Sequence, residues 1–155
     1  MVTSLHIPPF KVLRQAVTDG AAPWHLTTVV SERQRGIWHP EGAPATAHVV
    51  HNGIDLSHWR QGGAGDGSAV WAGRITPTKG TDLAAQAAQL AGVPLRIYRA
   101  IEHRDYFEQA VKPHLYGRVE YAGHLDTAAL ADAYGRASVA LFTPQWEEPF
   151  GLAAV

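Results

Sequence analysis

The sequence predicts an α/β protein built on parallel β-sheets, and three observations carry this prediction. Short apolar runs typical of buried strands recur at regular intervals after residue 68. Between successive runs lie segments whose apolar residues follow the 3.6-residue period of a helix. A glycine-rich stretch at 60–68, "RQGGAGDGS", separates two regions of different texture. Alternating strands and helices form βαβ units, whose right-handed crossovers place helices on both faces of a parallel sheet.

The second region has the more regular pattern. Thr81, a capping-type residue, opens a helical segment that Gly92 ends, and Asp126 caps a later helix. We therefore predict strands at 69–73, 94–98, 118–123 and 138–144, with helices at 81–92, 104–115 and 126–137.

The first region repeats the pattern on a smaller scale. Strand-forming stretches begin at Met1, Leu26 and Thr46, a helical stretch covers 10–17, and Ser31 is expected to cap a second helix. These strands are too few for a self-sufficient sheet, so we expect the rear part of a preceding domain. The predicted organisation is a partial N-terminal domain at 1–58, a linker at 59–68 and a C-terminal domain at 69–155.

Composition limits the function classes. The 155 residues are 46% hydrophobic and 17% charged, which is typical of a folded globular protein. A formal net charge of -1 gives no basic footprint for nucleic acid, and the lack of cysteine excludes disulfides and thiol nucleophiles. No apolar run is long enough to span a membrane, and the N-terminus lacks a signal-peptide pattern. We therefore expect a cytoplasmic protein.

Nine histidines raise the question of a metal site. No pair has the helical His-x-x-x-His spacing with a neighbouring glutamate that a zinc hydrolase needs. His48 and His51 lie three apart where a strand runs into a loop, so their side chains are expected to face opposite ways. The spacing therefore predicts no metal site.

A cationic loop follows the first strand of the second region. In parallel sheets, ligands gather at the carboxyl ends of the strands. Here "GRITPTKG" places Arg74 and Lys79 at such an end, just ahead of a helix. Two cations beside the unpaired amides of a helix N-terminus would suit a diphosphate. The alternative is two solvated cations in a surface loop, because exposed lysine and arginine are common.

A carboxylate motif, "QWEEPFGL", follows the last predicted strand. Pro149 suits the first turn of a helix, so we expect a helix to begin there and leave the amides at 150–152 without intrahelical partners. Gly151 would let a ligand approach the backbone closely. Glu148 could accept hydrogen bonds from hydroxyl groups, whereas Glu147 is expected to be a solvated neighbour. The alternative is that both glutamates only complement the helix dipole.

Two further positions remain ambiguous from local chemistry. Asn52 and Gly53, in "HNGID", lie where the two regions meet and also fit a plain Asn-Gly turn. His6, in "SLHIPP", lies at a strand end, where a structural role is the simpler interpretation.

Taken together, "NGID", "GRITPTKG" and "WEEPFGL", in this order and with βαβ spacing between them, resemble the family 4 (group 1) glycosyltransferases. Members of that family are retaining enzymes with the GT-B fold of two Rossmann-like domains. The resemblance implies a hexosyltransferase that moves a sugar from a UDP-, GDP- or ADP-sugar to an unknown acceptor hydroxyl, with no metal or other cofactor. Any membrane association is expected to be peripheral and to belong to the full-length parent.

The resemblance also implies roles for individual residues. Arg74 and Lys79 would neutralise the leaving diphosphate, Glu148 would hold donor-sugar hydroxyls, and His6 would lie near the reacting centre. The remaining donor-binding residues that it implies are Asn52, Gly53, Gly73, Phe150, Gly151 and Leu152.

The chain also departs from the family pattern. We expect it to be a fragment that lacks the glycine-rich phosphate loop of the N-terminal domain, with the second signature glutamate falling immediately beyond Val155. Arg99 stands where many relatives have glycine. Two alternatives therefore stay open. One is a non-catalytic nucleotide-sugar-binding fragment. The other is a nicotinamide-dependent oxidoreductase, which the absence of a Gly-x-Gly-x-x-Gly motif disfavours.

Overall fold

The computed structural model describes residues 1–60 and 62–154. Gln61 of the expected linker and Val155 of the expected C-terminal domain therefore lie outside the described residues. The chain forms two compact units. Unit 1 consists of Met1–Gly53 together with Glu147–Leu152, and unit 2 of Ile54–Trp146 together with the residues that follow Leu152. The segment Glu147–Leu152 thus packs with the N-terminal sheet, while the domain boundaries at 58 and 69 stay predictions.

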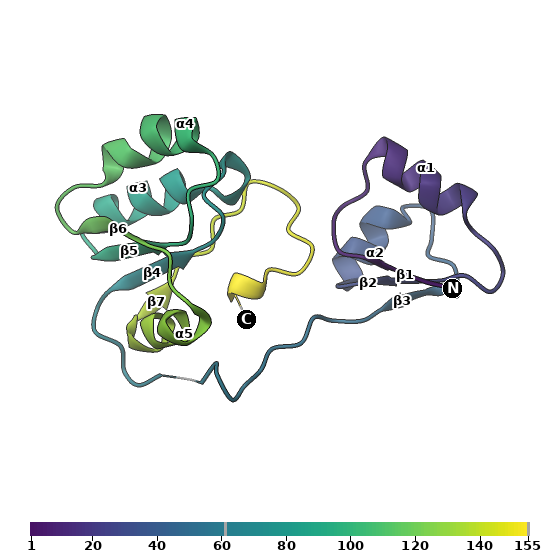
Figure 1. Ribbon diagram of the computed structural model, residues 1–155, viewed down its shortest axis with the longest axis horizontal. Coiled ribbons are helices and arrows are strands. Elements are labelled where there is room, and N and C mark those ends of the chain that lie inside the picture. The colour runs from purple at the N-terminus through teal and green to yellow at the C-terminus, as the bar shows by residue number, and fades with distance from the viewer. Residues whose placement is uncertain (61, 155) are drawn as a thin grey trace. The chain divides into compact units, whose positions relative to one another are not determined.

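Unit 1 is a three-stranded parallel sheet with the order β1-β2-β3 and two crossover helices (Figure 1). Its elements are β1 (Val2–Leu5), α1 (Lys11–Asp19), β2 (Leu26–Val29), α2 (Glu32–Trp38) and β3 (Ala47–Val49). The core forms where both helices cover one face of the sheet, with Leu5, Val29 and Trp38 buried and Leu13 and Val17 of α1 packed against them.

Unit 2 is a four-stranded parallel sheet with the order β6-β5-β4-β7. Its strands are β4 (Ala69–Ala72), β5 (Leu95–Tyr98), β6 (Val119–Gly123) and β7 (Val139–Ala140). Its α-helices are α3 (Thr81–Ala91), α4 (Arg104–Tyr106) and α5 (Thr127–Arg136). Helices α3 and α4 lie over one face and α5 over the other (Figure 1). The predicted α/β class with parallel sheets and βαβ connections is therefore confirmed.

The alternation of side chains along β4 explains the two helix layers. Successive strand residues point to opposite faces, so Trp71 packs in the core cluster that contains α3 residues such as Ala84, whereas Val70 packs with Ala133 of α5. Strand β4 is buried on both sides because it is central, as expected for a nearly continuous apolar run in a parallel sheet.

Two predicted elements are more irregular than the sequence indicates. The helix expected at 104–115 becomes α4, then π-helical turns over Phe107–Val111 and a 3-10 turn over Lys112–His114. Pro113 lacks the N–H that would continue the α-helical ladder. The strand expected at 138–144 is reduced to the two residues of β7, which pairs with β4 and lies at the edge of the sheet.

Helix α3 begins at Thr81, as predicted, but the predicted cap at Thr81 and the predicted helix start at Pro149 are wrong. Gly80, in the left-handed conformation with φ 62°, is the residue that precedes α3, and Thr81 lies fully buried inside the first turn. No helix begins at Pro149 either, because Gly151 has φ 83°, which interrupts helical geometry. A 3-10 turn over Leu152–Ala154 follows instead. The predicted caps at Ser31 and Asp126 are confirmed, since their side chains accept hydrogen bonds from the Gln34 and Ala129 amides.

Candidate functional site

Strand order places a topological switch point in unit 2. The chain runs from β4 outward to β5 and β6 and then returns to β7 on the other side of β4. In open parallel sheets, ligands bind beyond the carboxyl ends of the two strands at which the order reverses. The residues that follow β4 and β7 therefore form the candidate site of this unit.

The loop after β4 holds the two predicted cations at this switch point. Ile75 is fully buried and forms a parallel bridge with Ile101. This bridge anchors the start of the loop that follows β4. Arg74, which precedes this anchor, is half-exposed and lies 3.7 Å from the Glu102 carboxylate. The Lys79 ammonium lies 5.3 Å from the centroid of the Trp146 ring, in a cation–π arrangement.

Hydrogen bonds join this loop to the segment that follows β7. The Thr143 hydroxyl donates to the Gly80 carbonyl at 2.7 Å and accepts from the Trp71 indole at 3.1 Å. The backbone N–H of Gln145 donates to the Thr78 carbonyl at 2.8 Å. A β-carbon at Gly80 would lie 2.1 Å from the Thr143 carbonyl oxygen, so glycine is required for this close approach. The loop carrying Lys79 is thereby fixed at both ends.

The first turn of α3 already contains a carboxylate. The Tyr106 hydroxyl donates to Asp82 at 2.5 Å, and the Asp82 amide donates back to the Tyr106 oxygen at 3.1 Å. Burial and the hydrogen bond to Asp82 raise the pKa of Tyr106 to about 12, so the phenol stays protonated. Asp82 complements the helix dipole, and the cations near this helix start are Arg74 and Lys79 of the preceding loop.

Unit 1 brings a second group of predicted residues to the carboxyl edge of its sheet. His6 directly follows β1 and is exposed, and Asn52 and Gly53 follow β3. His51, beside them, bonds through Nδ1 to the Val30 carbonyl at 3.0 Å. The parallel register of β1, β2 and β3 places these strand ends at one edge.

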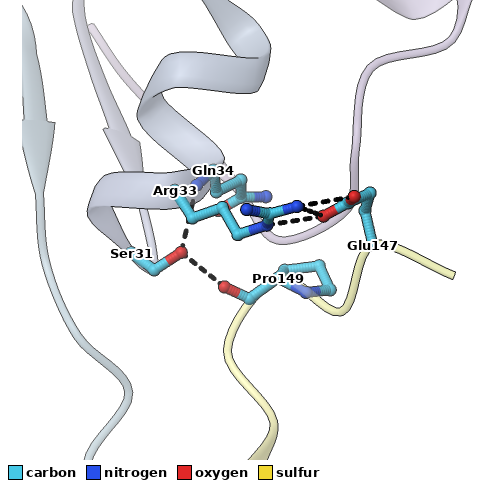
Figure 2. Close-up of polar contacts among 5 residues, drawn as sticks. All are labelled: Ser31, Arg33, Gln34, Glu147 and Pro149. Atoms are coloured by element: carbon cyan, nitrogen blue, oxygen red, sulfur yellow. Dashed lines mark hydrogen bonds and ion pairs between the residues drawn. The ribbon is translucent and has the colours of Figure 1, made fainter. Parts of the chain in front are cut away.

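The docked segment, which we define as Glu147–Leu152, attaches to this edge (Figure 2). The Ser31 hydroxyl donates to the Pro149 carbonyl at 2.6 Å, and Pro149 is buried. The Arg33 Nε and Nη2 atoms donate to the Glu147 carboxylate at 2.6 Å each. The ring of Phe150 lies 5.8 Å from that of His51.

Glu147 is exposed, as the sequence predicts, but its carboxylate is also paired with Arg33, which the sequence does not predict. The hydrogen bonds from Arg33 hold the pKa of this carboxyl below its ordinary value. The next residue, Glu148, is half-buried. Sequence reasoning missed Arg33 and His51 and treated Ser31 only as a helix cap, because none of them carries a local signal of its partner in the docked segment.

The predicted site residues thus form two groups. Unit 2 contains Gly73, Arg74 and Lys79, and unit 1 contains His6, Asn52, Gly53, Glu148, Phe150, Gly151 and Leu152. Within residues 1–60 and 62–154, no cluster of three or more histidine or acidic side chains is arranged to hold a metal ion. No helix in that same part of the chain has both the length and the apolarity to cross a membrane.

Arg99, at the carboxyl end of β5, has an unusual backbone. Its φ of 122° lies in the region that favours glycine. The conformation is held from both sides, since the Arg99 amide donates to the Gly123 carbonyl at 2.8 Å and the Tyr121 hydroxyl donates to the Arg99 carbonyl at 2.8 Å. The structure therefore keeps the geometry that suits glycine at a position where this chain has arginine.

Comparison with solved structures identifies similar folds. AviGT4, a glycosyltransferase involved in avilamycin A biosynthesis, matches 98% of this chain with TM-score 0.74 and 21% identity, over 44% of its own length. Anabaena HepE, in complex with UDP and glucose, matches 97% with TM-score 0.77 and 18% identity, over 48% of its length. A TarM variant from S. aureus, in complex with Fondaparinux, alpha-GlcNAc-glycerol and UDP, matches 98% with TM-score 0.78 and 18% identity, over 33% of its length.

The chain spans less than half the length of each of these structures. No protein-family model matches the sequence, and no curated protein matches it. At this level of identity the likeness establishes the fold. The chain has the Rossmann-like α/β architecture of GT-B glycosyltransferases.

Proposed function

We propose that this chain binds a nucleoside-diphosphate sugar and belongs to a retaining hexosyltransferase of glycosyltransferase family 4. The observation that carries the proposal is the cationic loop at the switch point of unit 2, with Arg74 and Lys79 held at the carboxyl end of β4. A pyrophosphate is the ligand chemistry that two fixed cations at such a position favour. The structures of HepE and TarM with UDP support the same ligand class.

In this proposal the residues of unit 1 recognise the sugar. Glu148 accepts hydrogen bonds from donor-sugar hydroxyls, and the amides at 150–152 donate to the sugar and phosphate oxygens. Because Gly151 is left-handed, the amides of 150 and 151 lie in a loop, and that of Leu152 opens a 3-10 turn instead of an α-helix. Asn52 and Gly53 contribute backbone contacts to the donor, Gly73 lets it approach β4, and His6 contacts the reacting sugar.

The proposed reaction breaks the bond between the anomeric carbon and the diphosphate oxygen, and the electron pair leaves with the diphosphate. The acceptor oxygen attacks from the same face, which retains the anomeric configuration, and its proton passes to the departing phosphate. Arg74 and Lys79 stabilise the charge that develops on the diphosphate, without a metal ion. Removing one preorganised donor of this kind typically costs about 3–4 kcal/mol of barrier stabilisation.

Calorimetry on the 155-residue chain tests the proposal. We expect saturable binding of at least one of UDP-, GDP- and ADP-glucose that persists in the chelator EDTA. Binding of NAD or NADP, with none of the three sugars bound, would favour the oxidoreductase alternative. A sugar-transfer and donor-hydrolysis assay on the same samples then distinguishes a catalytic chain from a binding fragment.

A further inference from the structure

The docked segment is attached to unit 1 by contacts on both sides of Glu148. Arg33 holds the preceding residue, Glu147, and Ser31 holds the following residue, Pro149 (Figure 2). The chain enters the segment from Trp146 and leaves it to Ala153, both of which belong to unit 2. The backbone of Glu148 is therefore restrained through its two neighbours.

We propose that Arg33 and Ser31 are positioning residues for the donor-binding carboxylate of Glu148. By fixing the residues before and after it, they hold the backbone from which the Glu148 side chain projects in one conformation before the sugar arrives. This inference rests on the proposed function, because it needs Glu148 to contact the donor. It adds two residues, from the start of α2, that the sequence motifs of the site do not include.

The geometry of the Arg33 contact favours this role. Two parallel hydrogen bonds from a planar guanidinium fix both the position and the rotation of the Glu147 carboxylate. A lysine could supply the charge but only as a single point, so it would restrain the rotation less. Both side chains are largely exposed, at 70% for Arg33 and 54% for Glu147, so orientation is the main consequence of the pair.

Ser31 couples the docked segment to the helix itself. Its hydroxyl oxygen accepts a hydrogen bond from the Gln34 amide at 3.1 Å, which caps α2, while its proton is donated to Pro149. Threonine preserves both contacts. Aspartate preserves the cap but cannot donate to the Pro149 carbonyl, so the two functions of Ser31 can be separated by substitution.

A matched control lies on the same helix. Arg35 pairs with Glu32 at 2.7 Å, and neither residue belongs to the docked segment or to the predicted site. Arg35→Gln therefore removes the same charge from α2 as Arg33→Gln and leaves the attachment of the docked segment intact.

The structural part of the test uses NMR on the full chain without ligand. The wild-type chain and the Arg35→Gln and Ser31→Thr variants should show nuclear Overhauser contacts between the rings of Phe150 and His51. These contacts should weaken in Arg33→Gln and Ser31→Asp. The {1H}-15N nuclear Overhauser values of the backbone amides at residues 150–152 should fall, because the segment becomes less ordered. Unchanged contacts and unchanged backbone order in both of these variants would overturn the proposed attachment.

The functional part measures the dissociation constant of UDP-glucose, with GDP- and ADP-glucose as alternatives. If only a fraction of the molecules has the segment docked, the apparent dissociation constant rises by the inverse of that fraction. We therefore expect increases of about three- to tenfold for Arg33→Gln and Ser31→Asp. Arg33→Lys should fall between wild type and Arg33→Gln. The charge exchange Arg33→Glu with Glu147→Arg should bind better than either single change, which a loss of overall stability cannot produce.

The two parts separate the possible failures. If the wild-type chain binds none of the three donors, the proposed function and the positioning role are both wrong, whatever the NMR contacts show. If wild type binds a donor and the weakened variants bind it equally well, the proposed function stands and the positioning role is overturned.

Discussion

The Arg33 guanidinium and the Glu147 carboxylate, 114 residues apart in the sequence, are joined by two hydrogen bonds of 2.6 Å. This contact fixes one end of the docked segment on a sheet formed by the first 53 residues. A motif that looks like the start of the next helix in unit 2 is thereby built into unit 1. The proposed donor site consequently depends on residues of α2 as well as on its own motif.

The Glu147 carboxyl provides a direct pH test of this contact. Because Arg33 lowers the pKa of Glu147 in the folded chain, the pair stabilises the attached state above the ordinary glutamate value of 4.5. That contribution is lost as the pH falls through the lowered pKa. Carboxyl-carbon NMR should give a Glu147 midpoint below 4.5 in the wild type and a midpoint that returns toward 4.5 in Arg33→Gln. Equal midpoints in the two proteins would contradict the pairing.

The cationic loop predicts a loss of donor affinity on neutralisation. Arg74→Gln and Lys79→Gln should each weaken UDP-glucose binding by about ten- to a hundredfold, because hydrogen bonds to charged groups contribute about 1.5–3 kcal/mol. Lys112→Gln is the control of equal charge change, since Lys112 pairs with Glu108 and precedes β6 at the opposite end of the sheet. Calorimetry measures the UDP-glucose affinity of all three variants. An equal loss of affinity in Arg74→Gln, Lys79→Gln and Lys112→Gln would indicate a nonspecific effect of net charge.

Gly80 and Gly92 form a matched pair for stability. Their φ values are 62° and 66°, so alanine is strained at both positions. At Gly92 a β-carbon meets no atom within 4 Å, and we expect Gly92→Ala to cost about 1–2 kcal/mol of unfolding free energy. At Gly80 the Thr143 carbonyl oxygen would lie 2.1 Å away, which should add about 1–3 kcal/mol. Urea unfolding measures both, and a Gly92→Ala variant as unstable as Gly80→Ala would refute the crowding.

The backbone at Arg99 predicts that glycine is tolerated there better than alanine. With φ at 122°, any residue with a β-carbon is strained, by about 1–3 kcal/mol. Arg99→Gly relieves that strain at an entropic cost of about 0.5–1 kcal/mol, whereas Arg99→Ala retains it. In urea unfolding, Arg99→Gly should therefore be the more stable of the two variants. The reverse order would show that the conformation is not strained.

The α/β architecture could be predicted because its signals are local. The apolar run of β4 and the 3.6-residue period of α3 depend on neighbouring residues, and right-handed βαβ crossovers place helices on both faces of the sheet. The length of β7 could not be predicted in the same way. An edge strand extends only as far as its neighbour, here β4, offers backbone partners, and local composition does not encode that limit.

The candidate site was predictable only in part. The position of Arg74 and Lys79 follows from the rule that ligands lie at carboxyl strand ends, and the structure places both residues there. The partner of Glu147 was not predictable, because an exposed arginine on α2 gives no sign of a contact with a distant segment. The helix expected at Pro149 failed because Gly151 can adopt either helical or left-handed geometry, and tertiary contacts select the second.

Chemical-shift mapping with UDP-, GDP- and ADP-glucose, each titrated into the 15N-labelled chain, determines whether this chain binds a nucleoside-diphosphate sugar through the proposed residues. We expect saturable shifts for one donor at the amides of 73–80 and of 150–152, the two groups of proposed donor contacts. Shifts confined to the opposite end of the unit 2 sheet, near Asp66 and Arg96, or no saturable shift with any donor, would contradict this expectation.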